Sequence, residues 1–453
     1  MVLCASALLA GCFAPVIPDL PRQTPEAWQV QSGSHGEAVA LRSWWRTLQD
    51  PILDSLVDEA LAGNLDLEQA ALRLHGERLI AERWGTSFMP GLTGEARPVQ
   101  DVSAQDMYFH ASLDMVWELG LFGALENSRL KAMADLGYAQ AGWQGLRVAV
   151  VASVVRNYLD LAQAQRQADL LDRLAGLDAR ERQLAQLRFE ARLGSQAEVA
   201  QAALQQAQTR VLQAFVQERA ERAARALALL LGREQPDPHW GAQAVARLPE
   251  SFSIAQVPAD LLRTRPDISQ AQAEVLQVAA QLGLARSALY PRLRLGGSIL
   301  YSYNITRNMR TSTDSVPSIG PMLDVPLWDW GARRARVKSS EKELEAALLG
   351  YRKAVLSGVS EVEACLASMG SQQHRVAALR EAAATMQARQ GRQRTLAGLG
   401  LSSALDGLQL ERAALLNEIE LSLASGARTL AFVALYKALG GAPLPTDPQG
   451  DAS

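Results

Sequence analysis

Cysteine is scarce in this chain of 453 residues, which contains only Cys4, Cys12 and Cys365. Three scattered cysteines exclude a disulfide framework and a zinc site built from thiolates. A basic excess is also missing, because the net charge is −3, so the sequence offers no electrostatic case for nucleic-acid binding. No uninterrupted run of about 18 apolar residues occurs, and we therefore expect no membrane-spanning helix. A chain of this kind can enter a membrane only as a closed β-barrel.

Histidine is nearly as sparse, and the spacing of the five residues fits no metal site. They are His35, His75, His110, His239 and His374. No hydroxyl or thiol stands in a recognisable nucleophile–base arrangement, and no glycine-rich phosphate loop follows a strand. We therefore predict a protein without a metal, a cofactor or an enzymatic reaction, in which the histidines lie on the surface or in packing contacts.

Proline is absent from two long stretches, residues 99–235 and 327–442, although the chain contains 19 prolines. Because proline breaks the interior of a helix, these stretches can hold very long helices. From Ala124 to about Arg188, apolar residues recur at spacings of three and four, as on one face of a helix. At about 1.5 Å per residue, such a helix is roughly 100 Å long. A soluble globular domain has no use for a helix of that length.

The sequence is duplicated, and the repeat predicts the architecture. Its first motifs recur at an offset of 201 residues and its later motifs at an offset of 208. The matching segments are 64–70 with 265–271, 88–90 with 289–291, 117–123 with 325–331, 193–199 with 401–407, and 229–232 with 437–440. The added residues then fall within 304–315. Each half is predicted to contain a helix, two strands and two very long helices, which are joined by turns at 193–195 and 398–400.

Between the first helix and the long helices of each half, the period of the apolar residues changes to two, as in a strand. The clearest segment places Leu295, Ile299 and Tyr301 on one face and Arg294, Ser298 and Ser302 on the other. The last segment alternates as far as Leu327. Alternation of this kind is typical of a transmembrane β-barrel, with the apolar face toward lipid and the polar face toward the lumen. A half-buried sheet in a soluble protein alternates in the same way.

Four strands per chain cannot close around a pore, because the diameter of a barrel grows with its number of strands. Three chains would supply twelve strands. The pattern therefore predicts a homotrimer in which the strands of three chains share one barrel.

The first twelve residues form a short apolar segment that ends in small residues, as in a secretion signal. Residues 9–12, Leu-Ala-Gly-Cys, resemble the bacterial lipobox, in which a peptidase cuts before the cysteine and the thiol is then lipidated. We therefore predict a signal peptide over 1–11 and a covalent lipid, such as palmitate, on Cys12. Four prolines between residues 15 and 25 indicate an extended tether over 12–50.

Together these features resemble the TolC-type outer-membrane factors over residues 44–441, and within them the lipoproteins that serve resistance-nodulation-division efflux pumps. The motifs that carry the resemblance are WELGLFG at 117–123, RTRPD at 263–267, ALYP at 288–291, PLWDWG at 326–331 and ALYKALGG at 434–441. Their order and their duplication make the resemblance specific.

The resemblance implies a mainly α-helical fold with a β-barrel contribution. Duplicated helix hairpins from three chains would form a twelve-helix α-barrel in the periplasm, below a twelve-stranded β-barrel in the outer membrane. It also implies a passive exit duct for drugs, toxic compounds or metal ions, with a periplasmic adaptor and an inner-membrane pump as partners. An exit duct for type I protein secretion and a periplasmic coiled-coil scaffold without a pore are the alternatives.

In this family the α-barrel narrows near the turns between the long helices, where acidic residues line the constriction. The resemblance assigns that role to Glu198 and Asp406, and a further acidic position of the family is Gln409 here. Both carboxylates also lie just inside a helix N-terminus, where a negative charge stabilises the helix. The sequence therefore leaves two roles for Glu198 and Asp406: a helix cap and a residue of the gate.

Some members of the family lock this constriction with a tyrosine and an arginine that pair with the acids. Their positions hold Ala397 and Ser402 in this chain. Arg392 and Arg394 lie nearby in the sequence and are the candidate replacements.

These features divide the chain into five segments. They are a signal peptide (1–11), a tether (12–50), a first repeat (51–246), a second repeat (247–441) and a flexible tail (442–453).

Overall fold

The computed structural model describes residues 39–102, 106–240, 260–306 and 314–444, together with 18–20, 25, 27–29 and 248. The predicted signal peptide, Cys12 and the predicted boundary between the repeats at 246/247 lie outside the described residues. The chain divides into two compact units. The first takes most of its residues from Leu72–Gly142 and Asp267–Ala354, and the second consists mainly of Trp143–Pro266 and Val355–Ser453, with Thr24–Ala71.

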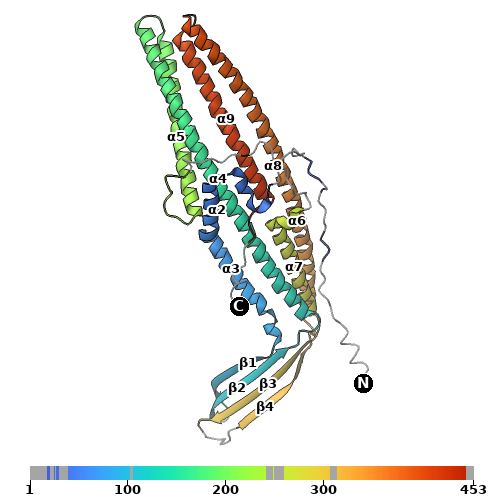
Figure 1. The fold of residues 1–453 in the computed structure, drawn as a ribbon. Coiled ribbons are helices and arrows are strands. Elements are labelled where there is room, and N and C mark those ends of the chain that lie inside the picture. Colours follow the sequence, from blue (N-terminus) through green and yellow to red (C-terminus); the bar gives the residue numbers. More distant parts are fainter. Residues whose placement is uncertain are drawn as a thin grey trace. The chain divides into compact units, whose positions relative to one another are not determined.

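Both halves of the chain contain two helices, two strands and two long helices in this order, and the first half adds the 3₁₀ helices η1 and η2 (Figure 1). The first half contains the 3₁₀ helix η1 (Leu41–Leu48), α2 (Pro51–Gly63), α3 (Leu65–Glu82), η2 (Trp84–Phe88), β1 (Gly91–Asp101), β2 (Asp106–Glu118), α4 (Ala124–Glu190) and α5 (Gln196–Leu230). The second contains α6 (Leu261–Thr264), α7 (Pro266–Ser287), β3 (Arg292–Asn304), β4 (Asp314–Asp324), α8 (Ala332–Gly398) and α9 (Ala404–Ala438). The helices α4 and α8 have 67 residues each, and α5 and α9 have 35 each. The predicted long helix from Ala124 is confirmed.

The duplication extends to the backbone geometry directly before the long helices. Phe122 has a φ of 55° and Trp330 a φ of 57°, and the glycines that follow, Gly123 and Gly331, have φ of 81° and 84°. Left-handed backbone is uncommon for bulky residues such as these. The two pairs are separated by the offset of the sequence repeat, so the same bend precedes both long helices.

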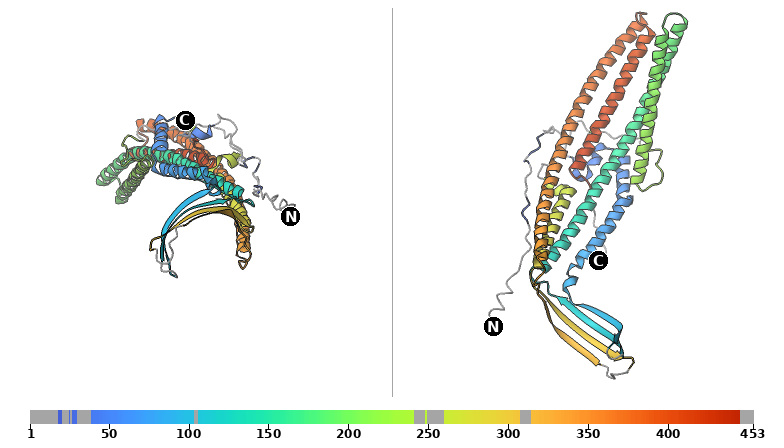
Figure 2. Two further views of the ribbon diagram at one scale, coloured as in Figure 1. Left: turned by 90° about the horizontal axis from the view of Figure 1, so that it is seen from below. Right: turned by 180° about the vertical axis from the view of Figure 1, so that it is seen from behind.

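The four strands form one antiparallel sheet in the order β1-β2-β3-β4, and this sheet is curved (Figure 2). Prolines occur in its edge strands, at Pro98 of β1 and at Pro317 and Pro321 of β4, where a missing N–H is tolerated. The strand β4 ends at Asp324, so the predicted alternation as far as Leu327 overshoots the strand. Pro326 has no N–H with which to continue the ladder.

Trp44 of η1 is fully buried in the second unit. The ring of Trp44 stacks on that of Tyr436 with 5.8 Å between centroids and meets Phe432 edge-on at 5.9 Å. Its Nε1 donates a hydrogen bond of 3.0 Å to the carbonyl oxygen of Gly441. This close approach requires glycine at position 441, because a Cβ there would lie 2.7 Å from Cδ1 of Trp44.

Among the described residues, α9 is long and apolar enough to cross a membrane on length and composition alone. Its most apolar window has a mean hydropathy of 1.2, and 44% of that window is buried within the chain. This test accepts charged residues within the window, so the expectation that no helix spans a membrane stays a prediction. The core helix of a soluble unit passes the same test, and Phe432 and Tyr436 of α9 pack on Trp44, so the finding is weak support for a membrane span.

Candidate functional site

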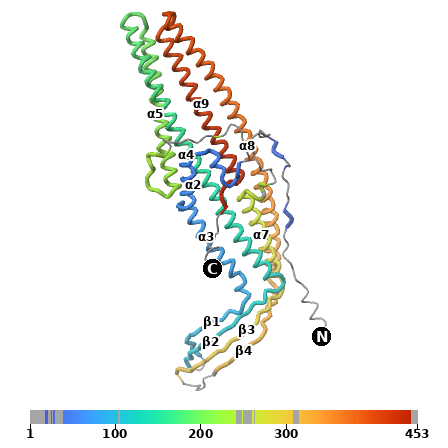
Figure 3. The backbone as a smooth tube through the Cα atoms, viewed as in Figure 1, coloured from blue at the N-terminus to red at the C-terminus, as the bar shows by residue number. Residues whose placement is uncertain are grey.

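The first candidate site is formed by the two turns that join α4 to α5 and α8 to α9 (Figure 3). Both helices end with the same backbone hydrogen bond: Leu193 N donates to Arg188 O at 2.7 Å, and Leu401 N donates to Leu396 O at 2.9 Å. The residue with a left-handed φ is Gly400 in the second turn (71°) and Arg192 in the first (61°). Glycine adopts this conformation without strain, whereas an arginine is disfavoured there by roughly 1–2 kcal/mol.

Both acidic candidates make helix-capping contacts. Ser195 is the N-cap of α5, and its Oγ accepts a hydrogen bond of 3.3 Å from Glu198 N. Ser403 is the N-cap of α9, and its Oγ accepts from Asp406 N at 3.1 Å while Asp406 Oδ2 accepts from Ser403 N at 3.2 Å. The second pair is a complete capping box, in which two otherwise unsatisfied N–H groups are paired. Gln409 is exposed and lies one turn further along α9.

A single arginine lies near both acids. The Nε of Arg188 is 3.8 Å from Glu198 Oε2. Hydrogen bonds from the side chain and then the backbone of Ser403 hold the pKa of Asp406 below its usual range, and the positive charge of Arg188 lowers it further. Asp406 and Glu198 are both exposed, so water screens these interactions.

Arg188 was not predicted as the basic partner. Within the described part of the chain, Arg392 and Arg394 make no ion pair, so the candidates chosen from the sequence do not take that place. The available signal was the position of Arg188 in the last turn of α4, where a cation favours the helix C-terminus and the chain then turns back toward Glu198.

The second candidate site is the sheet, whose register aligns apolar residues across all four strands. One row consists of Leu92, Met115, Gly297 and Ile319, and the next of Gly94, Leu113, Ile299 and Pro317. Ile299 is 52% exposed and Ile319 is 77% exposed. Leu295 and Tyr301 lie on the same face in neighbouring rows. The structure therefore brings the three predicted lipid-facing residues together on an exposed apolar face.

The opposite face carries the predicted lumen-facing residues. Ser298 lies across from Asp114 of β2 and Ser318 of β4. Ser302 lies across from His110, and Arg294 across from Glu118. This face has polar partners on neighbouring strands at all three predicted positions.

Comparison with known proteins establishes the family. The family model described as "Outer membrane efflux protein" matches residues 56–233 and again residues 257–441. The chain belongs to the outer membrane efflux protein family. This efflux protein is 28% identical over 438 residues to Nodulation protein T of Rhizobium leguminosarum bv. viciae. The match covers 95% of this chain and 89% of that protein. This chain is 27% identical over 454 residues to the pyoverdine export outer membrane protein OpmQ of Pseudomonas putida, which covers 96% and 95%.

Solved structures agree with this assignment. The outer-membrane channel OprN is 26% identical and superposes with a TM-score of 0.77 over 94% of this chain and 99% of that chain. The MtrE channel of Neisseria gonorrhoeae in its open state has the same fold, with a TM-score of 0.81, 23% identity and coverage of 95% and 98%. The predicted resemblance is thus confirmed, and this efflux protein is a mainly helical outer-membrane channel protein with a small sheet, not an enzyme.

Within the described residues of this efflux protein, no group of three or more His, Cys, Asp or Glu side chains is placed to hold a metal ion. Cys365 lies half-buried in α8, and burial raises the pKa of its thiol. A thiol in that state is a poor nucleophile.

Proposed function

We propose that three copies of this efflux protein form a continuous duct through the outer membrane and the periplasm. The observation that carries the proposal is the sheet, because one face exposes aligned apolar residues and the other aligns polar ones. An apolar face of this kind fits lipid, and the polar face fits a water-filled lumen. Four strands are too few to enclose a pore, whereas twelve strands from three chains are enough.

The duct is proposed to be the exit component of a tripartite efflux pump for small molecules. Relatives of this chain are named for pyoverdine export, for toluene efflux and for cation efflux. Because such components belong to pumps and efflux systems, a periplasmic adaptor and an inner-membrane pump are the expected partners. The pump would supply the energy, and this subunit would supply only the passage.

We further propose that the mature chain is anchored by lipid on Cys12, after removal of residues 1–11. The sequence Leu-Ala-Gly-Cys at 9–12, which follows a short apolar segment, supports this proposal. The anchor and the strands would then hold the same protein in the outer membrane.

The native mass of the protein extracted from membranes in neutral detergent is expected to equal three chains, each beginning at Cys12 and each heavier than its sequence by its acyl chains. Replacing Cys12 by serine should remove the added mass and leave the trimer intact, because the lipid takes no part in the contacts between strands. A monomer that still conducts ions in a planar bilayer would overturn the shared barrel. A trimer whose chains begin at a residue other than Cys12 and carry no added mass would overturn only the lipid anchor.

The turns are proposed to form the periplasmic gate, with Glu198 and Asp406 from each chain around one opening. Replacing Asp406 by alanine is expected to reduce cation selectivity and block by divalent ions in single-channel recordings, because a ring of carboxylates attracts cations. Arg188→Gln should shift selectivity in the opposite direction, since it removes the cation beside both acids. Because Ser403 lowers the pKa of Asp406, its charge should persist to a lower pH than that of an ordinary aspartate.

Ser403→Ala is the matched control for this experiment, since it removes the capping serine and keeps the carboxylate. Losing a cap lowers stability by about 0.5–2 kcal/mol. If Asp406→Ala and Ser403→Ala lower thermal stability alike and neither changes selectivity, the acid is a helix cap and not part of the gate.

A further inference from the structure

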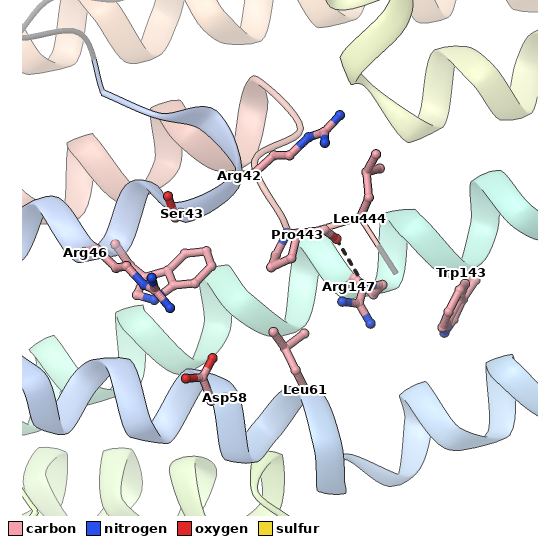
Figure 4. A pocket seen from close by; sticks show the side chains of 10 residues that line it. Arg42, Ser43, Arg46, Asp58, Leu61, Trp143, Arg147, Pro443 and Leu444 are labelled. Carbon is pink, nitrogen blue, oxygen red and sulfur yellow. Dashed lines mark hydrogen bonds between the residues drawn. The ribbon is translucent and has the colours of Figure 1, made fainter. Parts of the chain in front are cut away.

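A pocket of about 460 Å³ lies where η1, α2, α4 and the segment after α9 meet (Figure 4). All of its lining residues belong to the second unit. They are Arg42, Ser43, Trp45, Arg46, Asp58, Leu61, Trp143, Arg147, Pro443 and Leu444. Three arginines and one aspartate give the wall an excess of positive charge, and two tryptophans and two leucines give it apolar surface.

Arg147 of α4 is the most buried of these cations, since Arg42 and Arg46 are exposed. It is half-buried, and burial lowers the pKa of its guanidinium, with no neighbouring acid to oppose the shift. Its Nε donates a hydrogen bond of 3.3 Å to the carbonyl oxygen of Pro443, and its guanidinium carbon lies 5.4 Å from the ring centroid of Trp143 (Figure 4). No described residue accepts a hydrogen bond from its terminal nitrogens. Burying a cation without an anionic partner is costly, so this group favours an anion.

Two further donors on the wall have no acceptor. The Nε1 atoms of Trp45 and Trp143 are buried and have no hydrogen-bond partner in the part of the chain that is described. Trp45 as a whole is only 2% exposed. The indole N–H can donate but cannot accept, as is true of the guanidinium. Both indole nitrogens are closed off from the pocket, so the guanidinium of Arg147 is the donor that an oxyanion in the pocket would reach.

We propose that this pocket binds a small organic anion, a single carboxylate carried on an apolar, ring-sized body. Arg147 would hold the carboxylate through its planar fork, which matches the geometry of two carboxylate oxygens. Leu61 and Trp143 would contact the apolar body. The volume is within the range of small-molecule sites.

The walls of the pocket are segments from the two ends of the described chain and from α4. Occupancy would tie η1 and α2 to α4 and to residues 443–444. A ligand that binds only the folded protein raises its stability in proportion to the logarithm of ligand concentration. The expected physical effect of the anion is therefore a higher melting temperature of the channel.

The proposal is tested by titrating naphthoate into the full-length channel in neutral detergent, with isothermal calorimetry and thermal melting as readouts. Naphthoate should bind and raise the melting temperature, and Arg147→Gln should weaken binding about tenfold or more. Arg156→Gln is the matched control, since Arg156 is on the same helix, is 71% exposed and pairs with Asp160. That variant should bind naphthoate as the unmodified protein does.

Two probes on the unmodified protein keep the test decisive even if the Arg147 variant fails to fold. Naphthalenemethanol, which has the same ring without the charge, and inorganic phosphate, which has charge without the ring, should each bind about tenfold more weakly than naphthoate or worse. If naphthalenemethanol binds as tightly as naphthoate, the site does not require a negative charge. If phosphate binds as tightly as naphthoate, the site does not require an apolar body. Absence of naphthoate binding, or unchanged binding by a folded Arg147→Gln protein, would overturn the proposal as a whole.

Discussion

Replacement of Ile299 by arginine is expected to remove most of the assembled channel from the outer membrane. Ile299 lies in the middle of β3, on the exposed apolar face, between Leu113 of β2 and Pro317 of β4. An arginine on a lipid-facing position costs about 2–4 kcal/mol at the membrane midplane. A trimer would contain three such arginines, so roughly 6–12 kcal/mol would oppose assembly if the contributions add. The measurement is the fraction of protein that migrates as a trimer from purified outer membranes.

Ser298→Arg is the matched control, because it places the same side chain one residue away and on the opposite face. Ser298 lies across from Asp114, so an arginine there would meet a carboxylate and, in the proposed barrel, water. The trimer fraction should therefore stay close to that of the unmodified protein. Equal losses from the two variants would mean that the assignment of the two faces is wrong, and an Ile299→Arg protein that assembles normally would mean that this face does not contact lipid.

The long helices were predictable because their signals are local and repeated. The absence of proline between residues 99 and 235, together with the apolar spacings after Ala124, predicted α4 to within two residues at its C-terminal end. The turn after α8 could be placed because Gly400 and Ser403 carry its turn and cap chemistry within four residues. Strand ends were less certain, because the alternation of side chains continues past Asp324 while the hydrogen-bonded ladder does not.

Contacts between distant segments could not be predicted in the same way. The stacking of Trp44 on Tyr436 joins the two ends of the described chain, and no local pattern in the sequence reports it. Arg188 was missed as the neighbour of Glu198 and Asp406 because its place depends on how the chain turns and on the path of a long side chain. The pocket around Arg147 was missed for the same reason, since its walls come from four separate segments.

The largest loss expected in the helical part of the molecule is that of Arg412→Ala. The Nε of Arg412 in α9 donates a hydrogen bond of 2.9 Å to Asp178 Oδ1 of α4, and Thr209 Oγ1 of α5 donates one of 2.5 Å to Asp178 Oδ2. The side chain of Asp178 is fully buried, and that of Arg412 is 20% exposed. Removing the arginine leaves a buried carboxylate without its cation, which costs about 3–5 kcal/mol. The midpoint of thermal unfolding, followed by the helical circular dichroism signal, should fall accordingly.

Two comparisons separate the cost of an unpaired charge from the loss of a contact between helices. Arg375 of α8 pairs with Glu420 of α9 at 2.8 Å, but both side chains are 51% exposed, so Arg375→Ala should cost no more than about 1 kcal/mol. A double variant with Asp178→Leu and Arg412→Met removes both charges of the buried pair. It should recover most of the stability lost in Arg412→Ala, because apolar replacements of a buried ion pair are often neutral. If the double variant is as unstable as Arg412→Ala, the loss comes from the missing contacts between α4 and α9. If Arg412→Ala is no worse than Arg375→Ala, then water reaches Asp178 and the pair behaves as a surface ion pair.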